Sequence, residues 1–278
     1  MIDRSSILVE DPALAEGLHG NQLAAAVRDC VAATIRIPRG VWTPGDEIDG
    51  SRPGLGLLVL DGLLVRRVGL ALRFGAELLG DGDLLRPWQQ EDVATTLPRK
   101  GGWRALEPSR LAVLDEAFTA RAGRYPELIS ALFARVLRRS RTLATTIAIV
   151  HHTRVDVRLH MLFWELADRW GTVRRDGVHV PLRLTHAVLA DLVAAQRQTV
   201  SKALGELAEQ RAVVWTGDAW LLSGKPPAEL EGLTSFEFAA APAAEARLRS
   251  ARVQPLRLSA EQHAFAQAAG SDHERAAE

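Results

Sequence analysis

The stretch from Arg124 to Val150 has the apolar spacing of one long amphipathic helix, with no Gly or Pro after Pro126. Apolar residues in it recur seven positions apart: Ile129, Val136, Leu143 and Val150. Such a repeat is typical of a helix that packs along a second helix, and β-branched residues in it favour a two-stranded pairing. We therefore predict a dimerisation helix, whose face also includes Leu132. The alternative is a helix that packs only on its own β domain.

The preceding part of the chain, from Val31 to about Ala117, alternates short β-type runs with turn signals. The runs are Thr34–Ile37, Leu55–Leu60, Leu63–Val68 and Gly69–Phe74, and Gly80-Asp81-Gly82-Asp83 marks a later turn. This spacing predicts a compact antiparallel β barrel or roll, in which Asp61-Gly62 is the clearest hairpin signal. Residues 12–30 are expected to form a short helical lead-in.

After the long helix, the pattern changes to short elements in a defined order. A helix is predicted over Asp156–Trp170, with an apolar face made by Leu159, Leu162, Phe163 and Leu166. A strand-like segment, two helical runs and a hairpin follow: 178–184, 185–193, 196–210, and 213–215 with 220–222. This order is typical of a winged helix-turn-helix.

Together these elements predict an α+β protein with an N-terminal antiparallel β-roll. The expected divisions are a sensor domain over 1–123, a dimerisation helix and hinge over 124–153, a winged helix-turn-helix over 154–225, and a flexible tail over 226–278. The tail assignment rests on its weak periodicity and on Pro242 and Pro255, which interrupt any long helix.

Composition narrows the function classes. Lys plus Arg and Asp plus Glu both number 34, so any nucleic-acid surface must be local. Cys30 is the only cysteine, which excludes a disulfide within the chain and a four-cysteine cluster. The apolar runs are too short for a membrane span and the N-terminus does not resemble a signal peptide, so we expect a cytoplasmic protein. We find no nucleophile or phosphate-loop motif and no metal-ligand spacing among the histidines, and we expect no enzyme activity, metal or cofactor.

The segment Thr185–Leu204 carries the strongest functional signal. Its first helix presents Leu189, Leu192 and Val193 toward apolar residues of the second, which locks two short helices at a steep angle. Polar residues remain near the start of the second helix, as a helix inserted end-first into a major groove requires. The predicted DNA-binding residues are Thr185, Gln196, Arg197, Gln198, Thr199, Ser201 and Lys202.

This segment resembles the helix-turn-helix of the cyclic-AMP receptor (Crp/Fnr) family, and the similarity extends upstream to Asp156. The resemblance implies a homodimeric transcription regulator that binds a palindromic operator and contacts RNA polymerase. It places Thr185 on a backbone phosphate and puts Arg197, Gln198 and Lys202 at the base-reading positions. The chain departs from the family at Ala194, where glycine is usual. A positive φ there would cost alanine about 1 kcal/mol.

The sensor region resembles the family more weakly. Cyclic-nucleotide binders of the family carry a Gly-Glu pair followed by an Arg-Ser or Arg-Thr pair, whereas residues 82–89 read Gly-Asp-Leu-Leu-Arg-Pro-Trp-Gln. We therefore expect a small-molecule effector other than cAMP. Candidate effector contacts are Arg86, Trp88, Thr145 and Thr146. The rival interpretation is a winged helix that docks on the transcription machinery without specific DNA binding.

Overall fold

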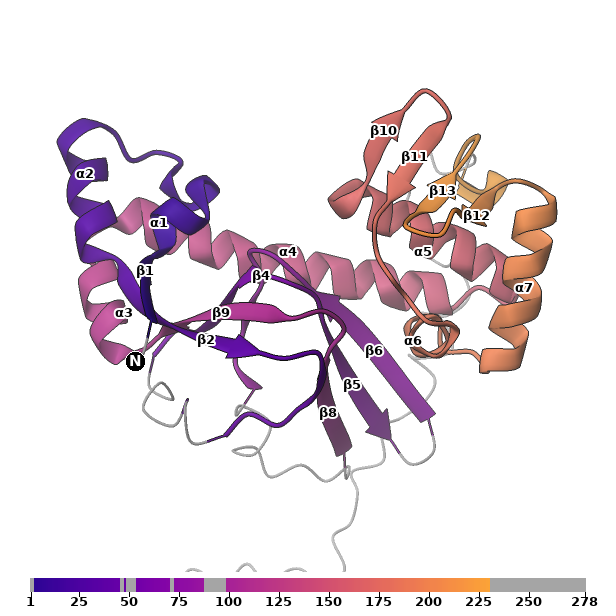
Figure 1. Ribbon diagram of the computed structural model, residues 1–278, viewed down its shortest axis with the longest axis horizontal. Helices are drawn as coiled ribbons and strands as arrows, with labels where there is room; N and C mark the ends of the chain where they lie inside the picture. The colour runs from indigo at the N-terminus through magenta and orange to yellow at the C-terminus, as the bar shows by residue number, and fades with distance from the viewer. Residues whose placement is uncertain (1–2, 46–47, 49–53, 71–72, 88–98, 231–278) are drawn as a thin grey trace, which may run out of the picture. The chain divides into compact units, whose positions relative to one another are not determined.

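The computed structural model describes residues 3–45, 48, 54–70, 73–87 and 99–230. Met1–Leu230 form one compact unit, in which an N-terminal β-roll is followed by a long helix and a winged helix (Figure 1). The predicted effector contact Trp88 and residues 231–278 of the predicted tail lie outside the described residues.

The predicted antiparallel β-roll is confirmed and consists, in the described residues, of two sheets (Figure 1). The first contains, in spatial order, β1 (Asp3–Ser6), β2 (Val31–Ile37), β9 (Ser109–Leu114), β4 (Gly56–Asp61) and β7 (Leu84–Leu85). The second contains β3 (Gly40–Trp42), β8 (Arg99–Ala105), β5 (Leu64–Leu70) and β6 (Arg73–Leu79). Strand β1 was not predicted from the sequence.

The first sheet is buried on both faces, which explains its continuous apolar runs. Leu57 and Val59 of β4 point into the core between the two sheets, while Leu58 points to the opposite face. That opposite face is covered by short helices and by the long helix α4. Because strand side chains alternate, a strand covered on both sides needs apolar residues at every position.

The hairpin predicted at Asp61-Gly62 is wrong. Strands β4 and β5 on either side of it belong to different sheets, so this segment is a corner. Gly62 has a φ of 103°, and a Cβ on it would lie 2.6 Å from the Cα of Ser109. Strand β5 pairs instead with β6, antiparallel and with Leu70 opposite Arg73, so the described residues of the predicted strand 69–74 are divided between two strands.

Four helices and a 3-10 turn accompany the roll in the described residues: α1 (Ile7–Glu10), η1 (Pro12–Ala15), α2 (Gly20–Asp29), α3 (Glu116–Ala122) and α4 (Pro126–Val150). Pro126 is the first residue of α4, where its missing N–H costs no helical hydrogen bond. The predicted long helix is thus confirmed, and the lead-in is helical over part of 12–30.

The long helix α4 has two different apolar faces. Leu128 and Leu132 are buried against the first sheet and its helices. Leu132 is only 2% exposed, so it belongs to the core of its own chain, and its assignment to the dimer face is wrong. Ile129 and Val150 are half-buried. A second face is exposed and consists of Phe133, Val136, Leu137, Leu143 and Ile147.

The predicted winged helix-turn-helix is confirmed. Its helices are α5 (Val155–Trp170), α6 (His186–Leu192) and α7 (Arg197–Glu209). Its sheet contains, in spatial order, β10 (Thr172–Arg174), β11 (Gly177–Val180), β13 (Trp220–Leu222) and β12 (Val213–Trp215), and a 3-10 turn, η4 (Ala228–Leu230), follows. The strand predicted over 178–184 is shorter than expected, since β11 ends at Val180. It pairs with β10, which was not predicted from the sequence.

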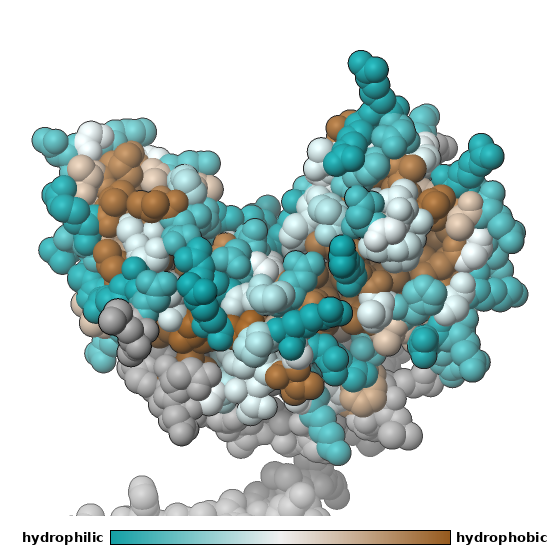
Figure 2. All heavy atoms as spheres, in the orientation of Figure 1, coloured by the Kyte–Doolittle hydropathy of each residue, from teal (hydrophilic) through white to brown (hydrophobic). Residues whose placement is uncertain are grey.

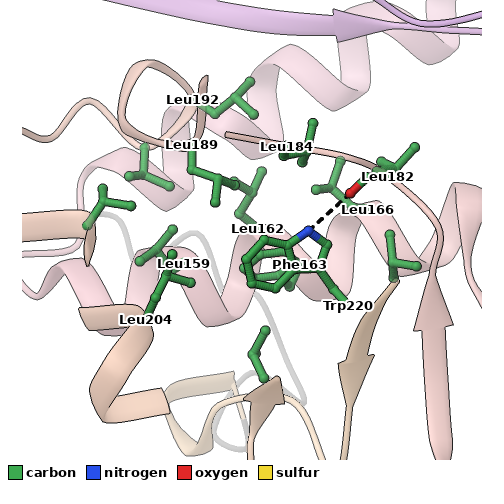
Figure 3. Packing of buried hydrophobic residues seen from close by; sticks show 14 of the residues in the cluster. Leu159, Leu162, Phe163, Leu166, Leu182, Leu184, Leu189, Leu192, Leu204 and Trp220 are labelled. Atoms are coloured by element: carbon green, nitrogen blue, oxygen red, sulfur yellow. Dashed lines mark hydrogen bonds between the residues drawn. The ribbon is translucent and has the colours of Figure 1, made fainter. Parts of the chain in front are cut away.

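The winged helix is built around one apolar core, to which all three helices contribute (Figure 3). Trp220 packs on Phe163 with ring centroids 4.7 Å apart, and its Nε1 donates a 3.0 Å hydrogen bond to the Leu182 carbonyl (Figure 3). Leu63, the residue just before β5, is 2% exposed and belongs to the same core. The roll and the winged helix therefore share buried apolar surface.

Candidate nucleic-acid interface

The turn between α6 and α7 positions the second helix of the motif. Ala194 has a φ of 50°, which is the left-handed conformation expected where the family carries glycine. The Ala195 N–H donates to the Ala190 carbonyl at 2.9 Å, and this contact closes α6 with a Schellman motif. The angle between the two helices is therefore set by backbone hydrogen bonds.

Arg158 of α5 supports this turn from below. Its Nη1 donates to the carbonyl oxygens of Val193 and Ala194 at 3.1 and 3.4 Å, and its Nε donates to the His152 carbonyl. One guanidinium thus connects the end of α4, the start of α5 and the turn of the motif. Sequence reasoning missed Arg158, because the carbonyls that it contacts lie far along the chain and carry no side-chain signal.

The start of α7 presents the predicted reading residues to the outside. Val200 and Leu204 are buried against the core, and the side chains between them point away from it. Arg197 and Gln198 are exposed, and neither side chain has a hydrogen bond or ion pair within the described residues. Free donors at a helix N-terminus, where the helix dipole is positive, suit a negatively charged partner. Gln196, Thr199, Ser201 and Lys202 are exposed on the same end of α7.

Ser201 and Lys202 already have partners in the protein. The Ser201 hydroxyl donates to the Arg197 carbonyl at 3.1 Å and lies 2.8 Å from Nδ1 of His186 on α6. Ser201 therefore ties α7 to α6. The Lys202 ammonium lies 3.7 Å from Glu206, but it is largely exposed and remains available to another anion. His186 was treated as a surface residue in the sequence, and its role in this contact was missed.

Thr185 lies at the N-terminus of α6, as predicted. Its hydroxyl accepts a 3.3 Å hydrogen bond from the Val188 N–H and so caps the helix. The side chain is exposed at the same surface as the start of α7. Its predicted contact with a DNA phosphate stays a prediction.

Among the described residues, the predicted effector contacts Arg86, Thr145 and Thr146 do not line a common cavity. Thr145 is exposed, whereas the Thr146 hydroxyl donates to the Thr142 carbonyl at 2.9 Å and lines a cavity that contains neither Thr145 nor Arg86. Between the two sheets of the roll, Trp42 and Trp103 pack edge to face with centroids 5.8 Å apart. This aromatic pair is part of the roll's core.

Two other histidines, His160 and His179, contact neighbouring side chains. Trp164 donates through Nε1 to Nε2 of His160 at 3.1 Å, and His179 lies 3.0 Å from Asp176. Within the described ranges, no group of three or more His, Cys, Asp or Glu residues is arranged to hold a metal ion. In the same part of the chain, no helix is long and apolar enough to cross a membrane.

Comparison with known proteins agrees with this geometry. Residues 157–223 match the Crp-like helix-turn-helix domain. The CRP-like cAMP-activated global transcriptional regulator of Mycobacterium tuberculosis is 27% identical over 216 residues, which cover 75% of this chain and 91% of the relative.

Solved structures show the same fold. A CooA mutant from Carboxydothermus hydrogenoformans has a TM-score of 0.58 at 17% identity, covering 83% of this chain and 96% of that one. FixK2 from Bradyrhizobium japonicum has a TM-score of 0.52 at 15% identity, covering 74% of this chain and 98% of that one. Residues 157–223 therefore belong to the Crp-like helix-turn-helix domain family, and the chain has the fold of these solved structures.

Proposed function

We propose that this chain is a transcription regulator of the Crp/Fnr family that binds a palindromic operator as a homodimer and reads it with the start of α7. The observation that carries the proposal is the pair Arg197 and Gln198, which are exposed at a helix N-terminus and whose side chains have no partner within the described residues. A guanidinium matches guanine O6 and N7, and an amide matches adenine N6 and N7. Thr185, Gln196, Thr199, Ser201 and Lys202 then contact phosphates or neighbouring base edges.

The homodimer is proposed from the exposed face of α4. Phe133, Val136, Leu143 and Ile147 follow the alternating three- and four-residue spacing of a coiled-coil seam, with small Ser140 between them. A row of exposed apolar residues along one helix is costly in water and is offset when a second copy covers it. A two-fold pair of winged helices reads two half-sites in inverted orientation, which accounts for the palindrome.

Control by a small molecule other than cAMP completes the proposal, with RNA polymerase as the further partner. The M. tuberculosis relative is described as cAMP-activated. In this chain Trp42 and Trp103 pack together within the core between the sheets, and the family's phosphate cassette is absent from the sequence. Calorimetry with cAMP and cGMP should show no binding tighter than about millimolar, because residues 82–89 lack the Arg-Ser or Arg-Thr pair whose arginine would offset burial of the phosphate. Micromolar binding would contradict this part of the proposal.

Selection of operators from random duplexes tests the central claim. Rounds at increasing salt should enrich a palindrome whose half-site centres lie about one helical turn apart, because specific contacts survive salt that removes phosphate-only binding. The matched control is the double variant Arg197→Ala, Gln198→Ala, which should lose the enriched motif and keep its fold. If the wild type enriches no motif at any salt concentration, the winged helix is better explained as a protein-docking module.

A further inference from the structure

A cavity of about 380 Å³ lies where α4, α5 and β6 meet, away from both the DNA-facing surface and the interior of the roll. This volume falls in the range of sites that hold small organic molecules. Its walls come from the roll, through Glu77 and Leu78, and from the winged helix, through α5 and Leu192. A molecule bound here would contact both parts of the chain at once.

Much of the cavity wall is apolar. Leu162 and Leu166 of α5 and Leu192 of α6 turn partly toward it from the winged-helix core. Leu143 of α4 and the indole of Trp170 complete this side. The cavity therefore fits a ligand with an aliphatic or aromatic body.

Two of the carboxylates at the cavity are already neutralised by arginines. Glu77 accepts from Arg66 at 3.1 Å and from Arg139 at 2.6 Å. Asp83 is 2% exposed, pairs with Arg169 at 2.8 Å and accepts from the Gly80 N–H at 2.9 Å. These groups form closed ion pairs and offer little to a ligand.

Arg138 is different, because two of its donors are buried without a hydrogen-bond partner. Its Nε and Nη2 are both in this state, and the Asp83 carboxylate lies 3.9 Å from Nη2, which is too far for a hydrogen bond. Burial, and then the neighbouring guanidinium groups of Arg169 and Arg135, lower the pKa of Arg138. A buried donor without a partner costs about 1–3 kcal/mol, so an anionic group placed here would be stabilised.

Glu165 of α5 has a charge opposite to that of Arg138, and its carboxylate also lacks a partner within the described residues. It lines the same cavity, is half-buried, and has no hydrogen bond or ion pair in the described part of the chain. Burial, and then Asp168, raise the pKa of its carboxyl group. An ammonium group beside Glu165 would offset both effects.

From this arrangement we infer that the cavity binds a small zwitterion with an apolar side chain, of the hydrophobic amino-acid class. The ligand carboxylate pairs with Arg138, its ammonium pairs with Glu165, and its side chain packs on the leucines and Trp170. Because the ligand contacts both α4 and α5, it changes DNA affinity when it binds one arrangement of the two helices better than another. This regulatory step rests on the proposed function; the binding itself does not.

Calorimetry on the full-length protein without DNA tests the binding. Leucine and phenylalanine are the probes, and each should bind with a measurable dissociation constant. Phenylalaninamide lacks the carboxylate and 3-phenylpropionate lacks the ammonium, so each should bind about tenfold more weakly or worse, as the loss of one charge-assisted hydrogen bond predicts. Equal binding of phenylalanine and both analogues, or no binding by either amino acid, would overturn the inference.

Variants locate the site. Arg138→Gln and Glu165→Gln should each weaken phenylalanine binding about tenfold, and each should erase the preference over the analogue that lacks its partner group. The matched control is Arg141→Gln, an exposed arginine on α4 outside the cavity, which should bind like the wild type. If Arg141→Gln loses as much affinity as Arg138→Gln, the site is elsewhere. The analogue series decides the matter on the wild type if a cavity variant is unstable.

Operator affinity measured with and without phenylalanine then tests the regulatory step separately. Binding to the cavity without any change in operator affinity would retain the ligand site and reject its regulatory role. Failure of the operator selection would leave the calorimetric result unaffected.

Discussion

At the residue scale, Ala194 holds a backbone conformation that suits glycine. A left-handed residue with a Cβ is disfavoured by about 1 kcal/mol or more, because the Cβ approaches the following carbonyl oxygen. The Schellman motif at the end of α6 and the hydrogen bonds from Arg158 hold this conformation in place. The strained turn that sets the angle of α7 therefore lowers the stability of the domain.

Replacing Ala194 with Gly should raise the free energy of unfolding by about 1 kcal/mol, since glycine adopts this φ without the clash. Chemical denaturation measures the change. The matched control is Ala208→Gly, at an exposed helical position of α7, which should lower the same free energy by up to about 1 kcal/mol. Destabilisation by Ala194→Gly would show that the turn is not under the strain that its φ of 50° indicates.

The proposed preference for particular bases in the operator also depends on single residues, Arg197 and Gln198. Arg197→Ala should cost about 1–3 kcal/mol of operator binding and relax the preference for guanine at one position of each half-site. Gln198→Glu should move the neighbouring preference from adenine toward cytosine, because a carboxylate only accepts and suits the cytosine amino group. Selection with each variant measures both shifts. An unchanged preferred base in Gln198→Glu would remove Gln198 from the reading residues.

At the element scale, the two faces of α4 show what a sequence pattern can and cannot resolve. The seven-residue spacing of Val136 and Leu143 was enough to predict an exposed apolar stripe. It could not show that Leu132 lies on the other side, because both faces of the helix are apolar. The hairpin prediction at Asp61-Gly62 was wrong for a related reason. A turn signal does not show whether the next strand joins the same sheet.

Local pattern was sufficient where the contacts are local. The helix-turn-helix over 185–204 is formed by neighbours in sequence, so its apolar spacing, its cap at Thr185 and the left-handed turn at Ala194 could all be anticipated. The contacts of Arg158 with the turn and the cavity beside Arg138 depend on how distant segments pack. No spacing along the chain encodes them, and the structure was needed to find them.

Val136→Glu should break the proposed dimer, because two-fold symmetry would bury two like charges against each other. Light scattering should give the mass of a single chain for this variant and of two chains for the wild type. Arg141→Glu, which changes the charge by twice as much at an exposed position beside the stripe, should leave the mass unchanged. A dimeric Val136→Glu variant would place the interface on another surface.

At the scale of the whole molecule, the roll and the winged helix are joined by both charge and apolar contact. Arg67 on β5 pairs with Asp191 on α6 at 2.8 Å, and Arg169 on α5 reaches Asp83 of the roll at the same distance. Most of the visible surface elsewhere is hydrophilic, with hydrophobic residues in small patches (Figure 2). The proposed DNA-binding motif is thus anchored directly to strands β5 and β6.

Leu63 makes this junction thermodynamically significant. A side chain from the roll that completes the winged-helix core cannot leave it without exposing apolar surface, so the two parts should lose structure together. Scanning calorimetry should show a single two-state transition for residues 1–230, with equal calorimetric and van't Hoff enthalpies. Leu63→Ala removes the most buried roll side chain of this shared core, at a cost of about 2–5 kcal/mol, and should separate the melting of the winged helix from that of the roll. Two resolved transitions in the wild type would mean that each part melts as an independent cooperative unit.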